Sequence, residues 1–183
     1  TSFATSATTR TECGAITLPY HEGFENGGET CWRFATTGTY SNYYSINTYN
    51  YAEGTHSLRL YMNNIGNKSY AIMPELDNVN TLMVTFQNYD YYDELNQLEV
   101  GTMASPTDIA SFVPFFSTVG TDTWEAQEVR FDADTTGNRY IAFRATATTA
   151  SATYILIDDV TVMVAPSCQR PESVSATDIE ATS

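Results

Sequence analysis

Apolar and polar residues alternate along most of this chain, and the alternation predicts β-strands. It is clear in residues 56–62 (HSLRLYM) and 139–146 (RYIAFRAT), and a long run of strand-forming residues fills 153–164 (TYILIDDVTVMV). Successive side chains of a strand point to opposite faces, so this pattern buries one face of a sheet. Further segments of this kind are 16–20, 31–35, 69–73, 80–88, 96–103, 111–118 and 124–132.

Turn-forming residues separate these segments at short intervals. They are Gly27-Gly28, Gly54, Asn63-Asn64, Gly66-Asn67, Gly120 and Gly137-Asn138. About ten short strands with such regular breaks predict an all-β fold, either a two-sheet sandwich or a barrel. One helical turn is expected at 106–110, with Ser105 or Thr107 as its N-cap.

The composition divides the chain into three parts. Residues 13–165 are predicted to form one domain. Residues 1–12 are small and polar, which predicts a linker or the tail of a preceding domain, and residues 166–183 predict a linker or the start of a following domain. The chain begins at Thr1 without a signal peptide, so we expect it to be a piece of a longer, exported precursor.

The charge balance excludes two classes of partner. The chain has 22 acidic and 8 basic residues, a net charge of −14, and Lys68 is its only lysine. Nucleic-acid-binding surfaces and anionic membranes both require basic residues, so neither is an expected partner. No run of 18 apolar residues occurs, which excludes direct membrane insertion by a helix. An acidic chain rich in threonine and tyrosine, which favour strands, is expected to be secreted or to lie at the cell surface.

The sequence offers little for catalysis. His21 and His56 are its only histidines, and it has no G-x-S-x-G nucleophile elbow, no H-E-x-x-H motif and no phosphate-binding glycine loop. We therefore expect no enzyme activity. The rival hypothesis is a glycoside hydrolase, which needs only two carboxylates, and Glu99 and Glu128 lie on predicted strands where they could form such a pair.

A metal site is more plausible near Asp158 and Asp159. Both lie within an otherwise apolar strand, where alternation would turn one of them towards the interior. A buried carboxylate is costly unless it is paired or bound to a cation, and basic partners are scarce here. Together with Glu25, and with Glu22 and Asn26 as further oxygen donors, they predict a structural Ca²⁺ or Na⁺. The alternative is that both aspartates cap a strand end and accept backbone or tyrosine hydrogen bonds.

Two tyrosine clusters are candidate ligand-binding surfaces. Residues 40–51 and 89–93 combine tyrosine rings with Asn and Asp side chains, and both are predicted as loops. Sugar rings stack on such rings while their hydroxyls need polar partners, and protein partners use the same kind of surface. The candidate ligand-binding residues are Tyr43, Tyr44, Tyr89, Tyr91 and Tyr92. The alternative is that many of these rings belong to the core, with the hydroxyl at its rim.

Three cysteines allow at most one internal disulfide. Cys13 and Cys31 bracket the first predicted strand, and Cys168 follows the last. A Cys13–Cys31 bridge would close a short loop, whereas a Cys13–Cys168 bridge would join the two ends of the domain. The spacing alone leaves both pairings open.

Three motifs together resemble a known family. Residues 18–27 (LPYHEGFENG) followed by Cys31-Trp32 resemble the entry of MAM-like jelly-roll domains, and residues 154–162 (YILIDDVTV) followed by Cys168 resemble their exit. Residues 54–60 (GTHSLRL) are similar to the family's G-x-x-S-L strand. Within this group the chain resembles the cleaved-adhesin domains of Bacteroidetes cell-surface proteins, including the adhesin regions of gingipain proteases.

The resemblance implies a jelly-roll sandwich of two antiparallel sheets, whose first and last strands meet. It further implies that Glu25 lies near Asp158 and Asp159 around a structural cation, and that Cys13 pairs with Cys31. Residues 168–174 (CQRPESV) look like the start of a fibronectin type III-like domain. The chain lacks the middle cysteine pair of MAM domains, so the vertebrate adhesion functions of that family do not carry over.

These observations lead to one expected function and one rival. We expect a non-catalytic adhesion or carbohydrate-binding module of a multidomain bacterial surface or secreted protein. Its partner would be a glycan or a host or cell-surface protein, beside adjacent domains of the same polypeptide. The rival is a structural spacer or protein–protein interaction module that binds no glycan.

Overall fold

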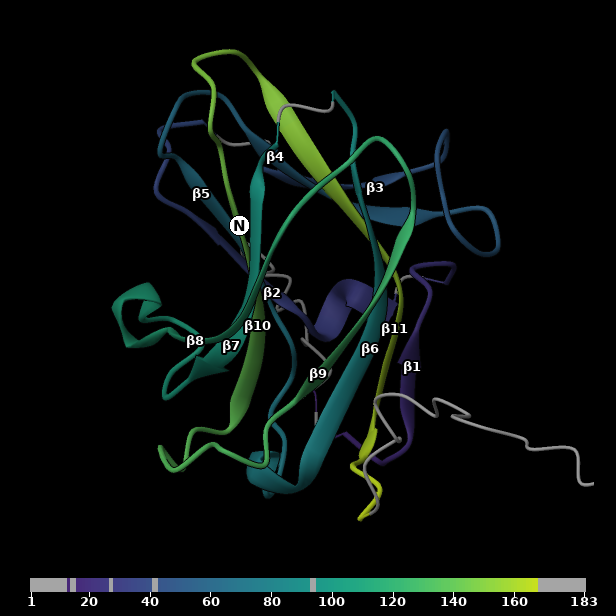
Figure 1. Cartoon of the computed structure of the whole chain (residues 1–183), viewed down its shortest axis with the longest axis vertical. Coiled ribbons are helices and arrows are strands. Elements are labelled where there is room, and N and C mark those ends of the chain that lie inside the picture. Colours follow the sequence, from purple (N-terminus) through teal and green to yellow (C-terminus); the bar gives the residue numbers. More distant parts are fainter. Residues whose placement is uncertain (1–12, 14–15, 27, 41–42, 93–94, 168–183) are drawn as a thin grey trace, which may run out of the picture.

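The computed structural model describes residues 13, 16–26, 28–40, 43–92 and 95–167. Within them the chain forms a jelly-roll β-sandwich of two antiparallel sheets (Figure 1). The strands are β1 (Tyr20–Glu22), β2 (Arg33–Thr36), β3 (Tyr44–Asn47), β4 (Ser57–Met62), β5 (Lys68–Ile72), β6 (Leu82–Asp90), β7 (Gln97–Met103), β8 (Val113–Val119), β9 (Glu125–Arg130), β10 (Tyr140–Thr146) and β11 (Thr153–Val164). Three 3₁₀ turns accompany them: η1 (Gly28–Cys31), η2 (Val79–Thr81) and η3 (Ile109–Ser111).

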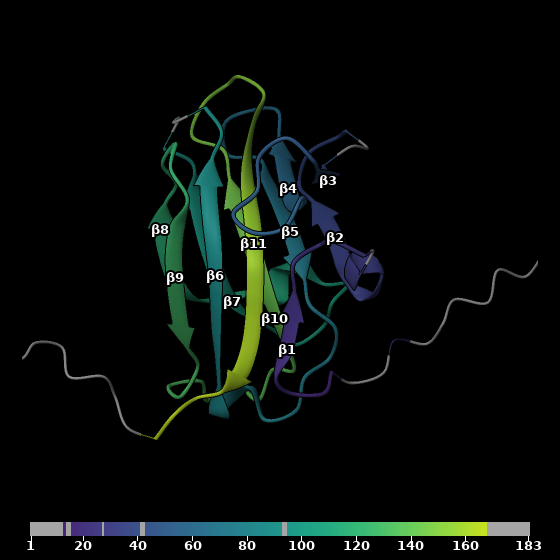
Figure 2. The ribbon, with the colours of Figure 1, turned by 90° about the vertical axis from the view of Figure 1, so that its right-hand side faces the viewer.

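The two sheets divide the strands almost equally. One sheet has the order β3-β4-β11-β6-β9 with β1 added beside β11, and the other has the order β2-β5-β10-β7-β8. The long strand β11 therefore lies at the centre of the six-stranded sheet, and Figure 2 shows it running the length of the molecule between β4 and β6. Because β1 pairs antiparallel with β11, the first and last strands of the described chain meet.

The core lies between the sheets and follows the predicted alternation. On β4 the inward side chains Leu58, Leu60 and Met62 are fully buried. Ile155 and Ile157 lie beside them on the neighbouring strand β11 and point to the same core. Burying aliphatic side chains of this size stabilises a fold by about 1.5–3 kcal/mol each relative to leaving them exposed. The other face of β4 and β11 points away from the core, and its residues form the candidate site described below.

Three local predictions were wrong. Residues 44–47 form β3, although their many polar side chains had suggested a loop. The first strand begins at Tyr20 instead of spanning 16–20. The helical turn spans Ile109–Ser111 instead of 106–110, because Asp108 is its N-cap and accepts a hydrogen bond from the backbone nitrogen of Ala110 at 3.0 Å.

The outer face of the five-stranded sheet carries its own small apolar cluster. Phe112 and the turn η3 pack there over Tyr70, Ile72 and Met103. Arg144 extends this cover: its guanidinium lies 4.2 Å above the Phe112 ring and is paired with Glu99. Much of this outer face is thus occupied by the chain itself.

A disulfide joins Cys13 to Cys31, which is the pairing that the family resemblance implies. It ties the segment before β1 to the turn η1, next to the buried Trp32. The alternative partner, Cys168, lies outside the described residues. Across the described chain, no helix is long and apolar enough to cross a membrane.

Candidate functional site

The loop between β3 and β4 folds back over the outer face of the six-stranded sheet. In Figure 2 this blue loop crosses in front of β11. The carboxylate of Asp158 holds it there, because Oδ2 accepts hydrogen bonds from the backbone nitrogens of Ala52 at 2.8 Å and Glu53 at 3.0 Å. Oδ1 accepts a third hydrogen bond from the backbone nitrogen of Asp159 at 2.7 Å. Asp158 is consequently buried, although it lies outside the sandwich core.

One of the two aspartates is buried, as expected, but it is buried beneath the loop and not between the two sheets. Ile157 faces the core and Asp158 faces outward. The pairing of β11 with β6 then shifts register between Asp158 and Thr161, and Asp159 has a φ of 50°. This bulge adds a residue to β11, so Asp159 turns to the surface while Val160 returns to the core. Periodicity alone does not reveal a bulge, so the sequence did not show that Asp159 lies at the surface.

Glu25 fastens the same loop at its other end. Its Oε1 accepts the backbone nitrogens of Thr55 and His56 at 2.7 and 2.8 Å, and its Oε2 lies 2.7 Å from the Thr55 hydroxyl and 2.9 Å from His56 Nδ1. Gly54 makes this approach possible: its φ is +65°, and a Cβ there would lie 2.2 Å from Glu25 Oε1. Glu25 and Asp158 thus bind the same loop, between β3 and β4.

Burial and hydrogen bonding move the pKa values of these two carboxylates in opposite directions. The pKa of Glu25 is lowered to about 2, mainly by the backbone hydrogen bond from Thr55 and then by the side chain of His56. The pKa of Asp158 is raised, because desolvation outweighs the three backbone hydrogen bonds that favour its charged form. A cation beside Asp158 would offset that desolvation.

Near this loop the structure gathers three possible metal ligands. One ligand atom each from His21, Glu53 and Asp159 lies within 4.8 Å of the others, and His21 Nε2 is 2.9 Å from Asp159 Oδ1. The carboxylates of Glu53 and Asp159 fit a hard cation such as Ca²⁺, while imidazole suits transition metals better. Asp158 is not a member of this group, although its Oδ1 retains a lone pair beside the hydrogen bond from the Asp159 nitrogen. Sequence reasoning proposed Asp159 and missed Glu53, which no motif marks.

Glu22, a further oxygen donor proposed from the sequence, is engaged elsewhere. It is buried, and its carboxylate accepts the Phe24 backbone nitrogen at 2.7 Å and the Tyr20 hydroxyl at 3.2 Å. Burial raises its pKa. Its contacts fix the turn that follows β1 and leads to Glu25.

Beyond the loop, aromatic rings gather on the outer face of the six-stranded sheet. Tyr154 of β11 is stacked with Tyr91 at a centroid distance of 4.5 Å and an interplanar angle of 29°, and Tyr92 meets its edge at 5.4 Å. Tyr89 continues the row to Trp124, 5.5 Å away. Tyr91 and Tyr92 are 40% and 54% exposed, so part of each side chain remains open to a ligand. We call these five residues the aromatic row.

A groove of about 410 Å³ runs beside the aromatic row. Its lining residues come from β3, the following loop, β4, β11 and the loop after β6: Ser45, Ile46, Asn47, Thr48, Tyr49, Arg59, Tyr91 and Tyr154. The tyrosine at its rim, Tyr49, is 91% exposed. The groove thus combines ring faces, hydroxyls, an amide and one cation, and no acidic side chain is among these lining residues.

The structure separates the five predicted ligand-binding tyrosines into two groups. Tyr89, Tyr91 and Tyr92 belong to the aromatic row. Tyr44 pairs in register with Leu60 and so faces the opposite side of the sheet, where it stacks on Phe34 at 3.7 Å. Tyr43 lies next to it and donates a hydrogen bond from its hydroxyl to the Phe34 carbonyl at 3.3 Å.

Sequence reasoning missed three members of this surface: Tyr154, Trp124 and Arg59. A usable signal existed for two of them. Leu58 and Leu60 mark the inward positions of β4, and Ile155 and Ile157 mark those of β11. By alternation, Arg59 and Tyr154 must then lie on the outer face. Trp124 had no such signal, since it precedes β9 and reaches the row from a loop, where its Nε1 donates to Asn50 Oδ1 at 2.9 Å.

The geometry does not favour the glycosidase hypothesis for Glu99 and Glu128. Glu99 is on β7 of the five-stranded sheet, where Arg144 holds it. Glu128 is on β9 of the six-stranded sheet, paired in register with the outward-facing Thr85. The two carboxylates lie on opposite outer faces of the sandwich and cannot flank one glycosidic bond.

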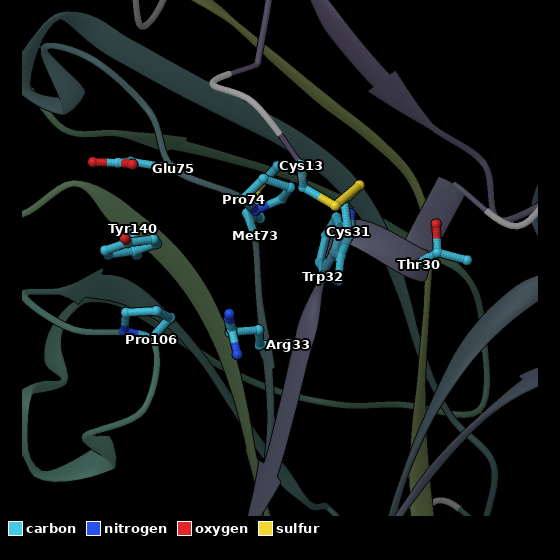
Figure 3. Close-up of a pocket in the computed structure, with 10 residues that line it drawn as sticks. All are labelled: Cys13, Thr30, Cys31, Trp32, Arg33, Met73, Pro74, Glu75, Pro106 and Tyr140. Atoms are coloured by element: carbon cyan, nitrogen blue, oxygen red, sulfur yellow. A yellow bond between two sulfur atoms is a disulfide. The ribbon is translucent and has the colours of Figure 1, made fainter. Parts of the chain in front are cut away.

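A second hollow, of about 480 Å³, lies at the Cys13–Cys31 disulfide (Figure 3). Pro74, Pro106 and Tyr140 line it together with the charged residues Arg33 and Glu75. Trp32 is only 4% exposed, so its ring offers little surface there, and Glu75 is already paired with Arg139. This hollow lacks an array of open ring faces, and we therefore take the groove as the candidate ligand site.

Comparison with solved structures shows the same fold in adhesin and carbohydrate-binding domains. The K1 cleaved adhesin domain of Lys-gingipain from Porphyromonas gingivalis W83 is 20% identical, with a TM-score of 0.68, and the match covers 82% of this chain and 100% of that domain. The K3 domain of the same protein is 20% identical, with a TM-score of 0.65 and coverage of 79% and 96%. The carbohydrate-binding module TmCBM61, solved with β-1,4-galactotriose, is 15% identical, with a TM-score of 0.57 and coverage of 78% and 94%.

These likenesses establish the fold. No family model matches the sequence, and no curated protein matches it.

Proposed function

We propose that this chain is a non-catalytic adhesion module that binds glycans in the groove beside the aromatic row. The observation that carries the proposal is the stacked pair of Tyr91 and Tyr154, whose neighbours extend it into a continuous surface of rings. Sugar rings present flat C–H faces that pack on such surfaces, and the amide of Asn47 and the hydroxyls of Ser45 and Thr48 can bond the sugar hydroxyls.

The shared fold supports this proposal. Solved domains with this fold include adhesin domains and carbohydrate-binding modules. Two of these carbohydrate-binding modules were solved with an oligosaccharide bound. We propose, as an extension of the same reasoning, that the chain belongs to a multidomain protein that is secreted or held at a bacterial cell surface. An acidic exterior, with a net charge of −14, is compatible with that setting.

The proposal includes a structural cation, Ca²⁺ or Na⁺, at the loop that Asp158 and Glu25 hold. Asp158, Asp159 and Glu53 would supply its oxygen ligands, and Glu25 would hold the loop in place through Thr55 and His56. Such an ion would offset the repulsion and desolvation of three nearby carboxylates. Its role would be to fix the loop that bears Tyr49 at the groove.

The test is a binding screen against immobilised neutral and acidic polysaccharides. We expect the wild-type protein to bind at least one glycan, and we expect Tyr91→Ala and Tyr154→Ala to weaken that binding at least about tenfold, as for buried aromatic anchors elsewhere. Tyr44→Ala is the matched control, because it removes the same ring from the opposite side of the sheet. Binding that Tyr44→Ala abolishes and Tyr91→Ala leaves intact would place the site elsewhere, and no binding by folded protein would refute the proposal.

A further inference from the structure

Arg59 and Arg33 are the two described arginines that have no ion pair with another described residue. Within the described part of the chain, the arginines that have a carboxylate partner are Arg130 with Asp132, Arg139 with Glu75 and Asp77, and Arg144 with Glu99. Arg59 has no ion pair among the described residues, although acidic residues outnumber basic ones almost threefold in this chain. It lies in the groove, whose lining contains no carboxylate.

The guanidinium of Arg59 is held in position by an aromatic ring. On β4, Arg59 is flanked by Ser45 of β3 and Leu156 of β11, so it points to the outer face. Its Cζ lies 5.4 Å from the centre of the Tyr154 ring, within range of a cation–π contact. This contact leaves the donor nitrogens of Arg59 without an ion pair among the described residues.

One of those donors is buried without a partner. Arg59 Nε is inaccessible to solvent and has no hydrogen-bond partner among the residues that the structure describes. A buried donor left unsatisfied costs free energy, and such groups in folded proteins call for a specific reason. Because Nε is closed to solvent, an acceptor brought by a ligand into the groove would bond the terminal nitrogens of the same guanidinium.

The chemistry of that acceptor follows from the guanidinium. The two terminal nitrogens form a fork that matches the two oxygens of a carboxylate. The nearest carboxylate of the protein along β11 is Asp158, and its oxygens are already bonded to the loop backbone. The fork is therefore available to a carboxylate from outside.

We propose that the groove selects a glycan that carries a carboxylate, as a uronic acid does, and that Arg59 is its specificity-determining residue. The inference rests on the proposed function, since the aromatic row would hold the sugar ring and Arg59 would bind its carboxylate. The negative charge of the whole protein opposes this choice at long range. At physiological salt that repulsion is screened beyond about 8 Å, whereas the contact in the groove is not.

The test compares one sugar backbone in two charge states. Oligogalacturonate and its methyl ester differ only in the free carboxylate, and neutral galactan serves as a third probe. We expect wild-type protein in 150 mM NaCl to bind oligogalacturonate about tenfold or more tightly than the ester, and Arg59→Gln to remove this preference. Arg33→Gln is the matched control: it removes the same charge at the disulfide hollow and should leave the preference unchanged.

A second variant guards against a folding defect. Arg59→Lys keeps the charge but loses the fork, and it should retain at most part of the preference while melting like the wild type. Equal binding of oligogalacturonate and ester, or of wild type and Arg59→Gln, would overturn the role of Arg59 and leave glycan binding standing. Binding of dextran sulfate in place of oligogalacturonate would also overturn it, since the groove would then recognise a sulfate and not a carboxylate. Failure to bind any of these glycans or those of the wider screen would overturn both proposals.

Discussion

The carboxylate of Asp158 lies 3.0 Å from the backbone nitrogen of Glu53, a residue 105 positions earlier in the chain. This bond and its neighbour to Ala52 fasten the loop after β3 onto the central strand of the six-stranded sheet. The loop in turn carries Tyr49 to the rim of the groove. A buried side chain with no direct place in the groove thus determines part of its shape.

Replacing Asp158 by asparagine is expected to destabilise the protein substantially. An amide presents a donor where the carboxylate accepts backbone N–H groups, and hydrogen bonds to charged groups contribute about 1.5–3 kcal/mol each. We expect the free energy of unfolding, measured by urea denaturation, to fall by about 3 kcal/mol. Asp159→Asn is the control: its side chain is 35% exposed and bonds His21 at the surface, so the loss should stay below about 1 kcal/mol. Equal losses of stability in the two variants would refute the claim that Asp158 holds the loop after β3 in place.

Glu25 gives the stability a defined dependence on pH. Its pKa falls to about 2 in the folded protein, mainly because Thr55 and His56 donate to it. A lowered pKa means that the group stabilises the fold above its unfolded value, near 4.5, and that this contribution is lost as the pH falls towards 2. Glu25→Gln should therefore lower the melting temperature at pH 7, and the difference from wild type should shrink between pH 4.5 and 2. A difference that stays constant over this range would contradict the assignment.

Reducing the disulfide should weaken the fold without abolishing it. Cys13 and Cys31 are separated by 18 positions, and closing a loop of that length stabilises by about 3 kcal/mol on the chain-entropy estimate. Urea denaturation with and without reductant measures this contribution. A Cys13→Ser/Cys31→Ser double variant should match the reduced protein and should not respond to reductant. If reductant still destabilised the double variant, the loss of stability would not come from the Cys13–Cys31 disulfide.

The proposed cation makes a separate prediction. Calcium at 1 mM, compared with chelator, should raise the melting temperature by several degrees if the ion binds in the micromolar range, because a ligand of the folded state stabilises it by mass action. Asp159→Ala combined with Glu53→Ala should remove the response. Tyr44→Ala should keep it, since Tyr44 lies on the opposite side of the sheet. Identical melting curves in calcium and chelator would refute a calcium ion at this loop.

The sequence predicted the fold well because its strands are amphipathic and their breaks are marked by glycine and asparagine. Leu58, Leu60, Ile155 and Ile157 alternate as a sheet with one buried face requires. It failed where a local irregularity or a long-range pairing decided the outcome. The bulge at Asp159 turned that side chain to the surface, where plain alternation after Ile157 would turn it inward, and pairing with β4 turned the polar segment 44–47 into a strand.

The site shows the same division. Tyrosine clustering singled out the segment around Tyr91, which contributes to the aromatic row, but it gave equal weight to Tyr44, whose register with Leu60 turns it to the other side of the sheet. Arg59 and Trp124 lie in the groove and the aromatic row only because β4 and the loop before β9 are brought beside β11 and β6. Alternation along one strand can place Arg59 on the outer face, but it does not show which strands and loops lie beside it.

The most direct test of glycan binding in the groove is a nuclear magnetic resonance titration of the ¹⁵N-labelled protein with the tightest glycan from the screen. We expect chemical-shift changes to concentrate on the groove, at the backbone amides of Asn47, Tyr49, Tyr91 and Tyr154 and at the Arg59 side-chain Nε–H. Amides around the Cys13–Cys31 hollow should stay unchanged. Shifts concentrated at that hollow, or at Tyr43 and Tyr44, would contradict the account.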